Sequence, residues 1–266
     1  MMGTTPRAAI VASARSGSTW LVSLLDSHPA IRFEGELFNL EHAPRAAISD
    51  PAGYLAAHLE RPGQHRIAGC KILYHQGRLA YLNDFLAEMG SGRTASVDWR
   101  SVFPNRPVTL DQVPALPRAW EAIRDQGRTR IIHLRRRNLL RQHLSHQMLM
   151  KASRAGWQAR APARPRRMIV STDRMLASFG DTVRAGGEVA CFFAGNPTLD
   201  VFYEDLSDDP RGHCERILGF LAVRRMPLRF DQRPRARPRL RQVIENYDEV
   251  AAALGREGYA EFIDDE

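Results

Sequence analysis

A loop of small residues, hydroxyls and one arginine lies between two apolar segments early in the chain. Residues 7–12 before it form an apolar, β-branched run, and the apolar residues of 18–25 recur at helical spacing. A loop between a strand and a helix directs backbone N–H groups and the positive end of the helix dipole at an anion. We therefore predict that residues 13–20 form an anion-binding loop of the kind that holds phosphate.

This loop differs from that of nucleoside-triphosphate enzymes at the residue that contacts the phosphates. Against the pattern G-x-x-x-x-G-K-[ST] it keeps Gly17 and Thr19. Ala12 stands in place of the first glycine, and Ser18 stands in place of the lysine. The nearest cation is Arg15, two residues before Gly17. A fixed cation beside N–H donors stabilises charge on the bridging oxygen of a leaving phosphate, and Arg15 is our candidate for that role.

A second candidate anion site follows the apolar run 129–134. Arg135, Arg136 and Arg137 come directly after this run, and Ser145 lies eight residues beyond Arg137 on the predicted next helix. Because neighbouring strand residues alternate faces, Arg135 and Arg136 cannot both point inward with Arg137. The chain has 36 arginines and only two lysines, so an arginine cluster by itself is weak evidence for a binding site.

Both segments resemble the donor-binding segments of sulfotransferases. The first reads, in order, Arg15, Ser16, Gly17, Ser18, Thr19 and Trp20. It resembles the family's loop of a basic residue, Ser, Gly, Ser or Thr, Thr and Trp, with arginine in place of the commoner lysine. The spacing of Arg137 and Ser145 is similar to that of the arginine and serine that hold the donor's 3'-phosphate. The resemblance implies that all of these residues bind 3'-phosphoadenosine 5'-phosphosulfate and that no metal is needed, although we favour a core position for Trp20.

Other segments resemble the bacterial carbohydrate-type branch, which includes the nodulation-factor sulfotransferases and, more distantly, trehalose sulfotransferase. They are residues 26–29, 33–39, 69–75, 202–206 and 244–249. In trehalose sulfotransferase a glutamate shortly after the donor loop is the general base, and Glu36 stands at the matching position. The resemblance implies a carbohydrate or natural-product hydroxyl as the acceptor.

Two other residues compete with Glu36 for the role of the base. Glu34 lies two residues before it, and His75 is a candidate because many eukaryotic sulfotransferases use histidine. His28, which precedes a proline, is expected to cap or pack at a helix end. Lys71 is one of the two lysines, which suggests that a compact ammonium group is needed near the sulfate or the acceptor.

The C-terminal part of the chain carries an Arg- and Pro-rich stretch, residues 224–239. Its prolines exclude a regular helix, so it is expected to be a loop. In sulfotransferases a loop at this place covers the 3'-phosphate and the adenine. The resemblance therefore implies that Arg233 or Arg235 contacts the donor. Glu204 and Asp205 are expected to cap the helix that follows them and to pair with nearby arginines.

The order of apolar segments predicts an α/β, P-loop-like three-layer fold with a central parallel sheet flanked by helices. The expected strands are 7–12, 66–73, 129–134 and 199–203, and the expected helices are 18–25, 77–89, 138–150, 210–220 and 240–254. Residues 1–266 are expected to form a single domain. Irregular segments at about 91–117 and 154–167 are expected on the acceptor side.

The net charge of +8 implies an anionic partner. Besides a sulfotransferase, two alternative functions are considered. The first is a P-loop nucleotide kinase, and the second is a non-catalytic module that binds nucleic acid or another anion. Scattered arginines without interleaved aromatic residues argue against nucleic acid.

No apolar run of about eighteen residues occurs, so we expect a cytoplasmic protein without an integral membrane segment. The three cysteines are expected to be reduced. Because sulfotransferases often dimerise, the resemblance is also compatible with a homodimer.

Overall fold

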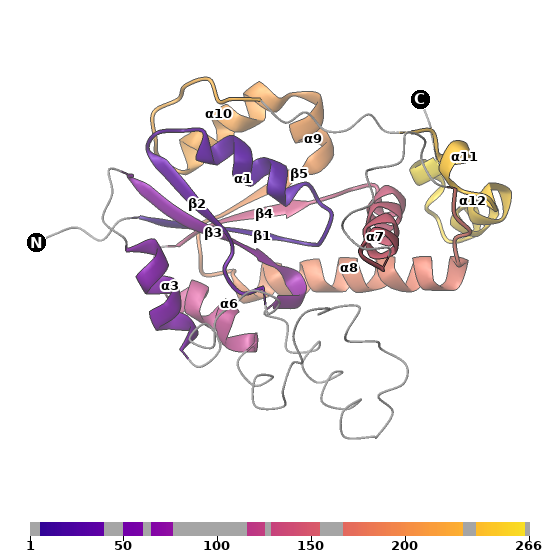
Figure 1. The fold of residues 1–266 in the computed structure, drawn as a ribbon, viewed down its shortest axis with the longest axis horizontal. Helices are drawn as coiled ribbons and strands as arrows, with labels where there is room; N and C mark the ends of the chain where they lie inside the picture. Colours follow the sequence, from indigo (N-terminus) through magenta and orange to yellow (C-terminus); the bar gives the residue numbers. More distant parts are fainter. Residues whose placement is uncertain are drawn as a thin grey trace, which may run out of the picture.

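The computed structural model describes residues 6–39, 50–60, 65–76, 116–125, 129–154, 167–230 and 238–263. Within them lies a sheet of five parallel strands in the order β2-β3-β1-β4-β5 (Figure 1). The strands are β1 (Arg7–Ala12), β2 (Ile31–Glu36), β3 (Ile67–Leu73), β4 (Arg130–Arg135) and β5 (Thr198–Phe202). The predicted α/β fold with a central parallel sheet flanked by helices is confirmed.

Strand β1 lies in the middle of the sheet, and all of its residues are buried. Ile10 is paired with Lys71 of β3 on one side and with Ile132 of β4 on the other. A strand that is covered on both faces reads as a continuous apolar run, which is why it could be predicted from the sequence. Because the strands are parallel, the residues that follow β1, β3 and β4 meet at one edge of the sheet.

Helices cover both faces of the sheet. One face packs against α1 (Ser18–Asp26), α9 (Tyr203–Asp208) and α10 (Pro210–Phe220). The other face packs against α3 (Pro51–Leu59), α6 (Leu116–Asp125) and α8 (Thr172–Phe192). Side chains of β1 alternate between the two cores: Ile10 belongs to the first and Val11 to the second.

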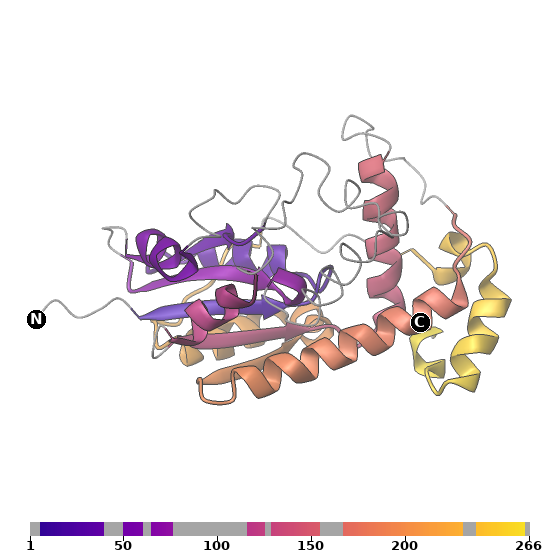
Figure 2. The ribbon, with the colours of Figure 1, turned by 90° about the horizontal axis from the view of Figure 1, so that it is seen from below.

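A third cluster of buried side chains lies beyond the carboxyl edge of the sheet. It joins α7 (Leu139–Arg154) and the first half of α8 to α11 (Leu240–Val243), α12 (Tyr247–Arg256) and the 3-10 turn η3 (Ala260–Ile263). Figure 2 shows α8 running from this cluster back along the sheet. Helix α7 therefore rises from the edge at which the loop after β1 also lies.

The prediction of one helix over residues 240–254 is wrong. Ile244 leaves the helical conformation and forms a parallel bridge with Met168. The N–H of Met168 donates to the carbonyl of Val243 (2.8 Å), and its carbonyl accepts from Glu245 (2.9 Å). These tertiary hydrogen bonds replace the helical ones, so the segment divides into α11 and α12.

Several elements were not predicted. Strand β2 contains Gly35 and three charged residues, a composition that is unusual for a strand, yet Ile31 and Phe33 are buried and the strand lies at the edge of the sheet. Helix α8 contains three glycines, which weaken its helical signal. Helices α3, α6 and α9 were also omitted.

The predicted helix 77–89 lies outside the described residues, as do residues 91–115 and 155–166 of the two segments that were predicted to be irregular. Leu116 and Pro117 instead begin α6. In the described part of the chain, no helix is both long and apolar enough to cross a membrane.

Candidate active site

The loop between β1 and α1 has a backbone that most residues avoid. Arg15 has φ 63° and Gly17 has φ 88°, both in the left-handed region. A non-glycine residue in such a conformation costs on the order of 1–3 kcal/mol, and such strain concentrates at functional sites. Two contacts hold the loop in this shape. The buried Ser16 hydroxyl donates to the carbonyl of Ser13 (2.8 Å), and the guanidinium of Arg136 donates to the carbonyl of Arg15 (3.1 Å).

Gly17 leaves the first turn of α1 open to an anion. It occupies the N-cap position and has no side chain to bond the first helical N–H groups. A Cβ atom at this position would overlap the ring of Tyr203, which packs against the loop. Trp20 contacts Tyr203 edge-on, with ring centroids 6.2 Å apart, and lies in the core with an exposed fraction of 8%. Its position is the one that the sequence analysis favoured.

Helix α7 is tied to this loop by two side chains one turn apart. The amide of Gln142 donates to the hydroxyl of Ser13 (2.7 Å) and to the carbonyl of Ala14 (2.8 Å). The guanidinium of Arg15 donates from Nε to the hydroxyl of Ser145 (2.9 Å). The structure thus brings Ser145 to the first anion loop. Gln142 was not predicted, although its position three residues before Ser145 places both on one helix face.

Arg135 ends β4, Arg136 and Arg137 follow it, and the three side chains alternate between two sides. Arg136 lies over the ring of Tyr203 (4.7 Å from its centroid) and faces the loop. Arg135 and Arg137 lie over the ring of Phe202, at 5.4 and 4.0 Å. The side chain of Arg137 therefore points to the opposite side of the chain from that of Arg136. Its guanidinium group forms a bidentate ion pair with the carboxylate of Asp205.

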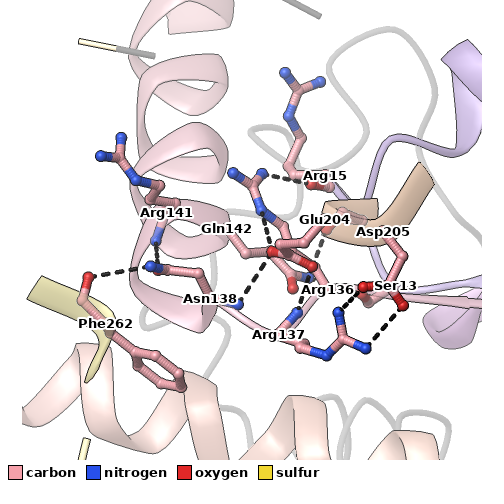
Figure 3. Close-up of polar contacts among 11 residues, drawn as sticks. Ser13, Arg15, Arg136, Arg137, Asn138, Arg141, Gln142, Glu204, Asp205 and Phe262 are labelled. Carbon is pink, nitrogen blue, oxygen red and sulfur yellow. Dashed lines mark hydrogen bonds and ion pairs between the residues drawn. The ribbon is translucent and has the colours of Figure 1, made fainter. Parts of the chain in front are cut away.

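Glu204 and Asp205 pair with the arginine segment, as predicted, but they do not cap the helix that follows α9. The carboxylate of Glu204 accepts from the backbone N–H groups of Arg137 (3.0 Å) and Asn138 (3.2 Å), just before α7 (Figure 3). Asp209 caps α10 instead, by accepting from Gly212 (3.0 Å). The pair therefore joins the start of α9 to the start of α7.

Glu36 is connected through Lys71 to Thr19, which follows Gly17 at the start of α1. The ammonium group of Lys71 lies 2.8 Å from Glu36 Oε1 and donates to the hydroxyl of Thr19 at 3.0 Å. The other oxygen of Glu36 accepts from the amide of Gln76 (2.9 Å). The Lys71 side chain is 8% exposed and that of Glu36 is 22% exposed, so the pair is shielded from water without being closed off. Both carboxylate oxygens are thereby fixed in direction.

A bulge at the end of β2 separates the two candidate glutamates. Glu34 is aligned with Cys70 of β3, and Glu36 is aligned with Lys71, so two steps along β2 oppose one step along β3. Cys70 and Lys71 point to opposite faces of the sheet, and the two carboxylates are separated accordingly. Glu34 lies near Arg32, at 3.7 Å, while Glu36 lies beside the loop.

His75 is in the same neighbourhood. It lies in the 3-10 turn η1 (Tyr74–Gln76), directly before the glutamine that holds Glu36. Burial lowers the pKa of His75, and the charge of His146 adds to this effect, while Glu36 opposes it. Burial and the nearby Arg15 likewise lower the pKa of His146. His146 was not predicted, and its position directly after Ser145 is the only sequence signal for it.

Three other residues were discussed from the sequence: Arg233, Arg235 and His28. Arg233 and Arg235 lie outside the described residues. His28 is buried, and its ring accepts from the N–H of Ala30 (3.0 Å) and donates to the carbonyl of Arg224 (2.9 Å), so it packs as expected.

A chain of hydrogen bonds, buried at Tyr74 and His133 and exposed at Asp200, anchors η1 to the sheet. The hydroxyl of Tyr74 and Nε2 of His133 are 2.6 Å apart, and Nδ1 of His133 lies 3.1 Å from a carboxylate oxygen of Asp200. With the Nδ1 proton directed at Asp200, Nε2 accepts from Tyr74. Burial, which outweighs the attraction of Asp200, lowers the pKa of His133 to about 4. His133 is therefore neutral in the folded protein near pH 7.

This burial predicts a pH-dependent stability. The unfolded chain protonates His133 near its ordinary pKa of 6.5, whereas the folded chain does so at about 4. The stabilisation is complete above pH 6.5 and is lost as the pH falls toward 4. Between pH 7 and pH 4.5 the free energy of unfolding should fall by about 2 kcal/mol from this residue. Urea unfolding of the protein and of His133→Gln at pH 7 and pH 4.5 measures the difference. Equal losses in the two proteins would contradict the assignment.

Comparison with known proteins identifies the family of the chain. A family model described as the sulfotransferase family matches residues 6–227. A sulfotransferase from Alicyclobacillus acidocaldarius has a similar structure, with 15% identity, a TM-score of 0.46, and coverage of 97% of this chain and 95% of that one. The sulfotransferase STF9 from Mycobacterium avium gives 13% identity, a TM-score of 0.42, and coverage of 96% and 76%. No curated protein matches the chain significantly in sequence. The family match includes β1, the anion loop, β4 and α9, and the chain belongs to the sulfotransferase family.

Proposed function

We propose that this sulfotransferase moves a sulfuryl group from 3'-phosphoadenosine 5'-phosphosulfate to a hydroxyl of a carbohydrate or a natural product. The observation that carries the proposal is the contact of Lys71 with both Thr19 and Glu36, at 3.0 and 2.8 Å. It places a carboxylate with a fixed orientation beside the loop that would hold the sulfate end of the donor. A base next to the transferred group is what attack by a hydroxyl requires.

The proposed reaction is an in-line displacement at sulfur. The acceptor oxygen forms a bond to sulfur while the bond from sulfur to the bridging oxygen of the 5'-phosphate breaks. The acceptor proton passes to the Glu36 carboxylate, and the electron pair of the broken bond stays on the phosphate. The products are a sulfate ester and 3'-phosphoadenosine 5'-phosphate. Lys71 and Gln76 keep Glu36 in place, so little reorganisation is needed as the proton moves.

The donor fits the cations and N–H groups of the loop. The first-turn N–H groups of α1 have no side-chain cap at Gly17, and Arg15 is the cation closest to them along the loop. We assign the 5'-phosphosulfate to this loop. Ser145 contacts Arg15 (2.9 Å). From their spacing in the sequence, Ser145 and Arg137 are proposed to hold the 3'-phosphate, although Arg137 lies on the other side from Arg136 and pairs with Asp205. Arg233 and Arg235 are proposed as further donor contacts.

The acceptor hydroxyl would approach the Glu36 carboxylate, whose side chain is 22% exposed. His75 stays the rival base, because its lowered pKa leaves it neutral and able to accept a proton near pH 7. We propose that residues 91–117 and 154–167 select the acceptor and that residues 1–266 form one catalytic domain.

Calorimetric titration tests the donor assignment. The protein should bind 3'-phosphoadenosine 5'-phosphate, and it should bind ATP with magnesium much more weakly, because Ser18 replaces the lysine that contacts nucleoside triphosphates. Tight binding of ATP alone would support a nucleotide kinase and overturn the proposal. Binding of neither ligand, with salt-dependent binding of RNA, would support the non-catalytic module.

A further inference from the structure

The arginine that the proposed function assigns to the 3'-phosphate is engaged by an internal carboxylate. The two terminal nitrogens of Arg137 bond the two oxygens of Asp205, one of them at 2.8 Å (Figure 3). The ring of Phe202 supports the guanidinium from one side, 4.0 Å from its centroid. The hydrogen bonds between them raise the pKa of Arg137 and lower that of Asp205. Both residues are charged near pH 7.

The pair is accessible to a ligand. The Arg137 side chain is 49% exposed and that of Asp205 is 34% exposed. A carboxylate and a phosphate each bind the two terminal N–H groups of an arginine through two parallel N–H···O bonds. Asp205 therefore uses the donors that a phosphate would use. A 3'-phosphate that approaches Arg137 must displace this carboxylate or accept its repulsion at short range.

We propose that Asp205 is a specificity-determining residue that competes with the donor's 3'-phosphate for Arg137. This inference rests on the proposed function, and in particular on Arg137 as the 3'-phosphate site. Asp205 holds the guanidinium against Phe202 and neutralises it, and it exchanges places with the phosphate on binding. The affinity for 3'-phosphorylated nucleotides is accordingly lower than the arginine alone would give, which favours release of the 3'-phosphorylated product.

Glu204, its neighbour, has a different role. Glu204 accepts from backbone N–H groups at the start of α7, at 3.0 and 3.2 Å, and so fixes the path of the chain. Within the described part of the chain, the carboxylate of Asp205 bonds the side chain of Arg137 and no backbone N–H group. Asp205→Asn therefore keeps the shape of the side chain and removes the charge without changing the backbone contacts. Asp208→Asn is the matched control, because Asp208 lies on the same short helix, is exposed and carries the same charge.

The test compares two nucleotides that differ only in the 3'-phosphate. The dissociation constants of 3'-phosphoadenosine 5'-phosphate and of adenosine 5'-phosphate are measured by calorimetry for the protein and each variant. The ratio of the two constants gives the preference for the 3'-phosphate. Asp205→Asn should raise this preference by about 3- to 10-fold through tighter binding of the bisphosphate alone. Asp208→Asn should change it by less than about twofold. In an Arg137→Gln background, Asp205→Asn should have no effect on the preference.

The outcomes separate this inference from the proposed function. If the protein prefers the bisphosphate but Asp205→Asn leaves that preference unchanged or lowers it, Asp205 does not compete, and a lower value would mean that it orients Arg137 for the phosphate. If the unaltered protein shows no preference for the bisphosphate, both the donor assignment and the role of Asp205 are wrong. A gain from Asp205→Asn that persists without Arg137 would also overturn the inference.

Discussion

Glu36→Gln should lower kcat by about 100- to 10,000-fold, the range expected for loss of a general base. Glutamine keeps one acceptor oxygen, which can accept from Lys71 or from Gln76. It cannot take the acceptor proton. The affinity for 3'-phosphoadenosine 5'-phosphate should change little, because the nucleotide is proposed to lie on the loop and α7. Single-turnover transfer and calorimetry on the same preparation separate the two effects.

Glu34→Gln is the matched control for this variant. Glu34 has the same chemistry and lies two residues away, but the bulge aligns it with Cys70 rather than with Lys71. Its replacement should leave kcat within about threefold, as expected for a partly exposed charge outside the site. Near-normal turnover of Glu36→Gln together with inactivity of His75→Ala would show that His75 is the base. Loss of activity in Glu34→Gln, with normal activity in Glu36→Gln, would show that Glu34 is the base.

Arg15→Ala should lower kcat/KM by about 100- to 1,000-fold, as for the loss of other groups that stabilise transition-state charge. The side chain is exposed, so the fold should be retained. Alanine in the left-handed conformation is strained as arginine is, which leaves the backbone term similar. The change removes the cation proposed for the leaving phosphate and also the partner of Ser145. Transfer kinetics and thermal unfolding of the variant measure both quantities.

Two further variants make the Arg15 result specific. Arg15→Lys restores a cation at a position where the related loops carry lysine, and it should recover activity to within about tenfold of the unaltered enzyme. Arg256→Ala removes an exposed arginine from the last turn of α12 and should have no measurable effect on transfer. Full activity of Arg15→Ala would remove Arg15 from the mechanism. Equal losses in Arg15→Ala and Arg256→Ala would indicate a general effect of charge.

The elements with strong local signals could be predicted from the sequence. β1 and β4 are continuous apolar runs, and α1 and α7 follow them with clear helical spacing, so these elements were predicted to within a few residues. The loop between β1 and α1 could be predicted because glycine at its end and hydroxyls beside it are local requirements of its shape. The single helix predicted for residues 240–254 failed because its interruption depends on Met168, far away in the chain.

The partners of the charged side chains depend on the tertiary structure. Glu34 and Glu36 have the same spacing as two residues on one face of a regular strand, and only the bulge against β3 directs Glu36 alone to Lys71. Arg137 was predicted to be a phosphate ligand, but its pairing with Asp205 depends on β4 and β5 lying side by side. Local propensity determines strands, helices and loop shape, because these depend on neighbours in the chain. The partner of a charged side chain depends on strand order and register, which bring together residues that are distant in sequence.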